Sequence, residues 1–134
     1  MPASATRAPI AATIPCFSPC SPVSWWRLRQ PDAFSLDDVA RIRRAIIGTE
    51  IPEEPDWRSA VLGNAPIAVG VAVRQLKSKR IGAAEVDLTL SAVLCCAIEG
   101  NAASAIVVSS ALRRRSKIDV RCKMLSELWL FADF

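Results

Sequence analysis

A chain of 134 residues is long enough to bury one hydrophobic core and too short for two domains of ordinary size. About half of its residues are apolar, but aromatic side chains are scarce and alanine is abundant, which favours closely packed helices over a large aromatic core. The net charge of +4 is modest, and the absence of histidine excludes the commonest general base and the commonest metal ligand.

The N-terminal segment is rich in proline and contains no acidic residue before position 32. Prolines at positions 9, 15, 19 and 22 would interrupt a helix or a central strand. We therefore expect residues 1–32 to form a flexible, disordered extension and residues 33–134 to form a single helical domain. A cleaved targeting peptide is the alternative, although the prolines break its apolar segment and no convincing cleavage site follows.

The first helix is predicted over residues 36–47. Ser35 is suited to cap its N-terminus, and Asp37 and Asp38 fall in the first turn, where the helix dipole favours acids. Gly48 is placed to end it.

An acidic connector with two prolines follows, over residues 49–56. Pro55 suits the first turn of a short helix that contains Trp57, and Gly63 is placed to end that helix.

Residues 64–80 carry two competing patterns. Residues 67–73 alternate between larger and smaller apolar side chains like a strand, but the same segment also has a helical stripe. We predict a helix, because Asn64 offers a cap before the run and no second convincing strand exists to pair with it.

The central feature is a predicted helical hairpin over residues 83–115. Two apolar runs, residues 88–98 and 102–112, are joined by Glu99, Gly100 and Asn101. Glycine can adopt the left-handed conformation that ends a helix, and an asparagine side chain can cap the next one. The predicted fold is therefore all-α: a small bundle of four to six short helices around this hairpin.

A transmembrane interpretation of residues 92–112 competes with the hairpin, because this window has one formal charge. Glu99 would then lie near the bilayer centre at a cost of about 3 kcal/mol, and Gly100 would break the helix there. A core hairpin avoids both penalties, so we do not expect membrane insertion.

A last helix is predicted after Asp119, a plausible cap. Its apolar face is expected to contain five residues: Met124, Leu125, Leu128, Trp129 and Ala132. Phe131 and Phe134 fall beside this stripe. Trp129, Phe131 and Phe134 are therefore the candidate interaction surface.

Six cations around the end of the hairpin form the candidate nucleic-acid site: Arg113, Arg114, Arg115, Lys117, Arg121 and Lys123. Such a cluster could neutralise phosphates and give salt-sensitive binding. Cations at a helix C-terminus also stabilise the helix itself, and no interleaved aromatic residues offer stacking platforms.

The five cysteines do not resemble a disulfide scaffold, because their number is odd and Cys95 and Cys96 are adjacent in an apolar run. A reducing, cytoplasmic location is expected. Cys16 and Cys20 have a spacing that a metal could use, but too few further ligands are available, so neither a metal nor a cofactor is expected. Cys122, between two cations, is interpreted as a surface thiol.

No acid–base apparatus for catalysis can be assembled from these residues. The leading hypothesis is a non-enzymatic protein–protein interaction module or small assembly subunit, whose partner is another protein or a second copy of the chain. The alternative is a small nucleic-acid-associated protein that uses the cluster at 113–123. An enzyme or redox protein that uses Cys122 is a third, weaker hypothesis.

Overall fold

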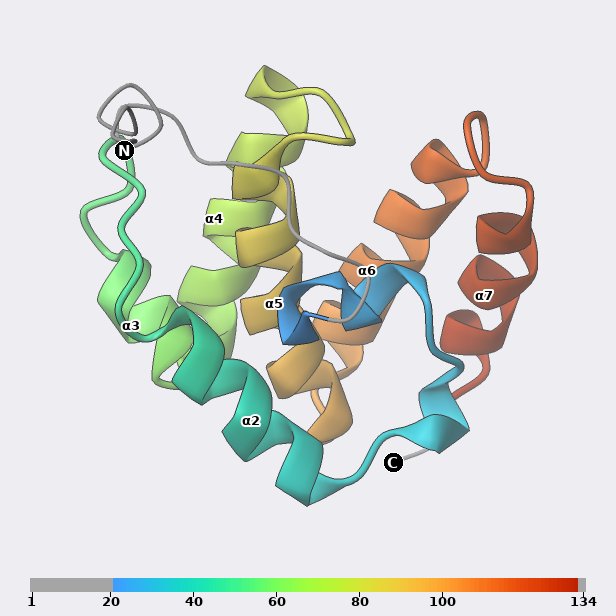
Figure 1. Cartoon of the computed structure of the whole chain (residues 1–134), viewed down its shortest axis with the longest axis horizontal. Coiled ribbons are helices and arrows are strands. Elements are labelled where there is room, and N and C mark those ends of the chain that lie inside the picture. Colours follow the sequence, from blue (N-terminus) through green and yellow to red (C-terminus); the bar gives the residue numbers. More distant parts are fainter. Residues whose placement is uncertain (1–20, 133–134) are drawn as a thin grey trace, which may run out of the picture.

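The computed structural model describes residues 21–132, and these fold into α-helices and 3-10 helices without a β-strand (Figure 1). The elements in chain order are η2 (Pro22–Arg27), η3 (Pro31–Ala33), α2 (Leu36–Ile46), α3 (Trp57–Val61), α4 (Ala65–Ser78), α5 (Ala84–Ile98), α6 (Ala102–Arg115) and α7 (Arg121–Leu130). The prediction of an all-α bundle around a central hairpin is confirmed. The expectation of disorder for residues 1–20 lies outside the described residues.

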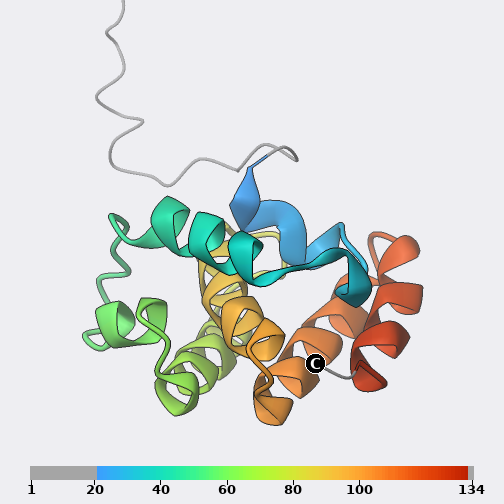
Figure 2. The same cartoon turned by 90° about the horizontal axis from the view of Figure 1, so that it is seen from below.

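Helix α5 is the core of the molecule. Every one of its residues except Glu85 is buried. Helices α4 and α6 lie on either side of it, while α2 and η2 cover it from a third direction (Figures 1 and 2). A helix that is apolar around its whole circumference must be enclosed in this way, because it has no polar face to present to water.

The corner between α5 and α6 forms as its sequence predicts. Gly100 has a φ of 102°, which is in the left-handed region, and the Asn101 Oδ1 atom accepts a hydrogen bond from the Ser104 amide at 2.8 Å. Arg43 of α2 donates two hydrogen bonds to the Glu99 carboxylate, at 2.9 and 2.7 Å. The corner is therefore closed by its own turn residues and tied to α2 by a bidentate ion pair.

Residues 65–78 form one helix, as predicted, and the strand alternative for residues 67–73 does not occur. The Asn64 Oδ1 atom accepts from the Ile67 amide at 3.2 Å, which is the cap that the sequence indicated. The capping signal before the run thus outweighed the alternation within it.

The folded part of the chain begins earlier than the expected boundary between residues 32 and 33. Residues 22–33 contain the two 3-10 helices, each of which starts at a proline, a residue that fits the first position of a helix. Trp26 is fully buried against α5, and its Nε1 atom donates to the Asp87 Oδ1 atom at 2.8 Å. The expectation of a flexible segment was therefore wrong for this part of the extension, because burial of tryptophan outweighs the disruptive effect of the prolines.

Candidate functional site

Helix α7 lies at one edge of the molecule, beside α6 (Figures 1 and 2). The N-cap position of α7 is Val120, one residue after the predicted cap Asp119. The Asp119 Oδ1 atom still accepts a hydrogen bond from the Arg121 amide, at 3.1 Å. The helix packs mainly against α6 and also contacts η3 and the end of η2, and its other side faces solvent.

The inner face of α7 consists of Cys122, Leu125, Ser126 and Trp129. Ser126 and Ser109 of α6 bond reciprocally: each hydroxyl donates to the backbone carbonyl of the other residue, and both distances are 2.8 Å. These buried hydrogen bonds fix the rotation of α7 about its axis, since any other rotation would leave two buried hydroxyls without partners.

A line of four large apolar side chains runs along the outer side of α7, from Val120 just before the helix to Phe131 just after it. Val120 is 79% exposed, Met124 53%, Leu128 38% and Phe131 84%. Their spacings of four, four and three residues place them on one side of the helix, opposite the buried residues. We call these four residues the α7 outer face.

Charged residues accompany this face. Lys123 and Glu127 are both exposed and lie four residues apart along one flank of it. Neither forms an ion pair within residues 21–132. The flank therefore presents one positive and one negative charge that remain available to another molecule.

The predicted interaction residues fall in three different places. Trp129 is buried, and its ring centroid lies 6.1 Å from that of Phe34, so its assignment to a binding surface was wrong. Phe131 is the most exposed residue of the α7 outer face, and Phe134 lies outside the described residues.

Val120, Met124 and Leu128 are exposed, which the sequence pattern did not indicate. Met124 and Leu128 were predicted for the buried stripe, and they are exposed because apolar side chains occupy more than one side of this helix. The two buried serines of the α6–α7 contact were the signal that could have indicated the inner face, but a serine alone does not predict its own burial.

The six residues of the predicted basic cluster do not form one uniform surface. Arg114 donates hydrogen bonds to the carbonyls of Leu76 and Lys79 at the end of α4. Arg121 pairs with Asp119, with its Nη2 atom 3.1 Å from the carboxylate. Arg115 is half-buried, while the remaining three members are exposed: Arg113, Lys117 and Lys123. Their binding to nucleic acid stays a prediction.

The thiols of the described residues are all buried. Cys122 is fully enclosed beside the backbone carbonyl of Arg27, so its interpretation as a surface thiol was wrong. Burial raises the pKa of the Cys122 thiol and raises that of Cys95 to about 12, which keeps both in the unreactive protonated form at neutral pH. This protonation state provides no support for nucleophilic chemistry at Cys122.

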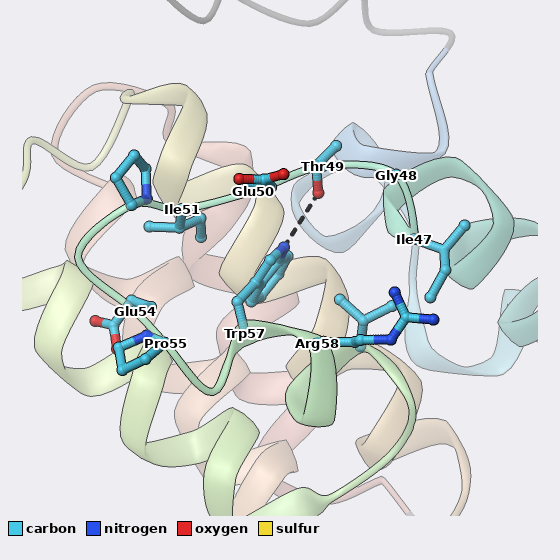
Figure 3. A pocket seen from close by; sticks show the side chains of 11 residues that line it. Ile47, Gly48, Thr49, Glu50, Ile51, Glu54, Pro55, Trp57 and Arg58 are labelled. Atoms are coloured by element: carbon cyan, nitrogen blue, oxygen red, sulfur yellow. Dashed lines mark hydrogen bonds between the residues drawn. The ribbon is translucent and has the colours of Figure 1, made fainter.

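A pocket of about 480 Å³ lies between the end of α2 and the start of α3 (Figure 3). Trp57 donates from its Nε1 atom to the Thr49 hydroxyl at 3.2 Å, and that hydroxyl donates to the Ile46 carbonyl. Glu54, which also lines the pocket, accepts hydrogen bonds from Arg74 and Gln75. These three polar side chains of the lining are thus occupied by protein partners.

None of the helices in residues 21–132 is both long and apolar enough to span a membrane. The same residues contain no group of three or more Cys, Asp or Glu side chains that could hold a metal ion.

Comparison with known proteins found no matching family model, no matching curated protein and no matching solved structure.

Proposed function

We propose that this chain is a non-enzymatic interaction module that pairs with a second copy of itself through the α7 outer face. The observation that carries the proposal is the line of four exposed apolar side chains on a helix whose opposite face is fixed by buried hydrogen bonds. Contiguous apolar surface of this kind is typical of protein–protein contacts, because its burial removes it from water.

The spacing of these side chains fits an antiparallel pair of α7 helices. Along the helix axis, the middle of the face is level with Leu125 and Ser126. A two-fold axis that crosses the face at this level would place Val120 of one copy near Phe131 of the other. Met124 and Leu128 would then meet at the centre of the contact. A two-fold arrangement uses the same patch on both copies, which is how most homodimers are built.

The charged flank supports the same arrangement. In an antiparallel two-fold pair, equivalent flanks face each other, as in antiparallel coiled coils. Lys123 of each copy would then lie opposite Glu127 of the other. The flank is therefore complementary in charge to itself in such a pair.

The contact would be small, since α7 has only ten residues. It would bury less than the roughly 1,600 Å² of a standard interface, so we expect a dissociation constant in about the micromolar range. A cytoplasmic location is part of the proposal, because Cys95, Cys96 and Cys122 are free thiols, as a reducing compartment requires.

Sedimentation velocity between about 1 and 500 µM tests the pairing, a range chosen to span a micromolar dissociation constant. We expect the wild-type protein to shift from monomer to dimer with concentration, and the double substitution M124E/L128E to remain monomeric. Leu62→Glu is the matched control, because Leu62 is also exposed but lies next to α3, away from α7. Circular dichroism confirms that each variant is folded.

A charge exchange tests the orientation of the pair. Lys123→Glu should weaken dimerisation, because the carboxylate introduced at this position would then face Glu127 of the second copy, and adding Glu127→Lys should restore it. A wild-type protein that stays monomeric throughout the concentration range would refute the proposal. Equal loss of pairing in the Leu62→Glu control would refute the assignment to α7.

A further inference from the structure

The C-terminal ends of α4 and α6 lie side by side, although they are far apart in the sequence. Arg114 of α6 bridges them, because its guanidinium donates to the backbone carbonyls of Leu76 and Lys79. This bridge brings together the cations of two separate basic segments, which we call the basic end: Lys77, Arg80, Arg113, Arg114 and Lys117.

The charges of the basic end are not neutralised within the described part of the chain. None of its five residues forms an ion pair in residues 21–132. Of the nearby acids, Glu53 and Glu85 lie 4.0 and 3.9 Å from Lys79, the C-cap residue of α4, and Asp119 pairs with Arg121. Positive charge that is not paired within the fold favours contact with acidic groups of another molecule.

A groove of about 410 Å³ runs between α4 and α6 into this basic end. It is lined by Val73, Leu76, Lys77, Ser110, Ala111 and Arg114. The small side chains on α6 leave room for a partner, Val73 is 37% exposed and Leu76 is half-buried. The groove thus combines an apolar floor with two cations, Lys77 and Arg114, in its lining.

We propose that this groove binds an acidic, amphipathic peptide segment of a partner protein. Apolar side chains of the segment would cover Val73 and Leu76, while its carboxylates would approach Lys77 and the neighbouring cations. Arg114 is held in place by the two carbonyls and retains further N–H groups, so it is a pre-oriented donor at the groove.

A peptide fits these features better than a nucleic acid does. A phosphate backbone would use the cations but would leave the apolar floor uncovered, and none of the lining residues is an aromatic side chain on which a base could stack. The groove lies on α4 and α6 rather than on the outer face of α7, so its occupation does not depend on the proposed pairing.

Fluorescence anisotropy with the full chain tests this proposal. The probe is a fluorescein-labelled helical peptide of about 14 residues, with leucines along one face and glutamates on both flanks. Three comparison probes are used: a peptide of identical composition with the leucines scattered around the helix, a peptide with lysine in place of glutamate, and a single-stranded DNA. We expect measurable binding of the acidic amphipathic peptide and at least tenfold weaker binding of each comparison probe.

Variants locate the binding. Val73→Asp and Lys77→Glu are both exposed-site substitutions, and each should raise the dissociation constant about tenfold or more, because they place a negative charge in the groove. Arg41→Glu on α2 is the control and should have no effect beyond a small change in salt dependence. Thermal melts show whether the variants are folded. If one groove variant does not fold, the other still tests whether the peptide binds in the groove.

Three outcomes would overturn the proposal. Absence of peptide binding at about 500 µM protein would remove it, since that concentration detects even weak peptide complexes. Equal binding of the scattered peptide would indicate simple charge attraction without use of the floor. Binding of DNA at least as tight as that of the peptide would assign the basic end to a nucleic acid instead.

Discussion

Glu54 is a loop residue whose carboxylate is held by hydrogen bonds from two residues of a neighbouring helix. Its side chain is almost fully buried and accepts hydrogen bonds from Arg74 at 2.8 Å and from Gln75 at 3.0 Å. The hydrogen bond from Arg74 is the main cause of the lowered pKa of this carboxyl, with a smaller contribution in the same direction from Gln75. The interaction attaches the connector before α3 to helix α4.

Replacing Glu54 by glutamine should lower the free energy of unfolding at pH 7 by about 1.5–3 kcal/mol, the range for hydrogen bonds to charged groups. Because the folded-state pKa is depressed, the ionised carboxylate stabilises the fold above its ordinary pKa of 4.5, and this contribution is lost as the pH falls through the lower folded value. Urea unfolding of both proteins from pH 7 downward should show the difference shrinking below about pH 4.5.

The exposed Glu50 provides the control for this measurement, because it belongs to the same loop and forms no ion pair within residues 21–132. Glu50→Gln should leave stability nearly unchanged at every pH. A stability difference for Glu54→Gln that stays constant with pH would contradict the assigned role of its charge.

At the scale of the element, the α5–α6 corner depends on backbone conformation. Gly100 has a φ of 102°, where a side chain introduces strain. Gly48, which follows α2, offers a matched position, because a Cβ built there meets nothing within 4 Å and its φ is outside the left-handed region. Comparing alanine substitutions at the two glycines therefore separates the cost of the left-handed conformation from the general effect on stability of replacing a glycine.

Gly100→Ala should lower the free energy of unfolding by about 1–2 kcal/mol, because alanine must be forced into the left-handed region. Gly48→Ala should be neutral or slightly stabilising, since it reduces the freedom of the unfolded chain without strain. Thermal or urea denaturation of the two variants beside the wild type gives the comparison. Equal effects in the two variants would show that the corner does not depend on the special conformation of Gly100.

For helix α7, the sequence pattern predicted the helix but not which of its sides is buried. Of the five residues predicted for its buried face, Leu125 and Trp129 are buried and Ala132 is half-buried, whereas Met124 and Leu128 are exposed. Periodicity identified the helix correctly but could not orient it, because apolar residues lie on both sides. The reciprocal pairing of Ser109 with Ser126 decided the orientation, and that pairing exists only once α6 and α7 are in contact.

At the scale of the whole molecule, the segment 22–34 adds a second connection between the central helix α5 and the edge helix α7, which are also joined through α6. Trp26 and Arg27 both bond to the buried Asp87 of α5, at 2.8 and 3.2 Å. Phe34, at the other end of the segment, contacts Trp129 of α7. The segment thus covers the central helix and reaches the edge helix (Figure 2).

Trp26→Ala should lower the free energy of unfolding by about 3–5 kcal/mol, because it opens a large cavity against α5 and removes a partner of Asp87. Trp26→Phe should have a smaller effect, about 1–2 kcal/mol, since it keeps most of the ring and loses the hydrogen bond. Urea denaturation followed by circular dichroism measures both. Wild-type stability of Trp26→Ala would show that the segment is dispensable for the fold.

The amino-acid sequence by itself determined the helical class, the positions of the α-helices, and the corner at Gly100 and Asn101. These features depend on local capping, turn chemistry and periodicity, which act between residues close together in the chain. Only the tertiary structure decided that Trp26 is buried against Asp87, that α7 exposes Met124 and Leu128, and that the C-terminal ends of α4 and α6 meet to form the basic end. Each of these depends on contacts between residues distant in sequence, whose geometry no local pattern specifies.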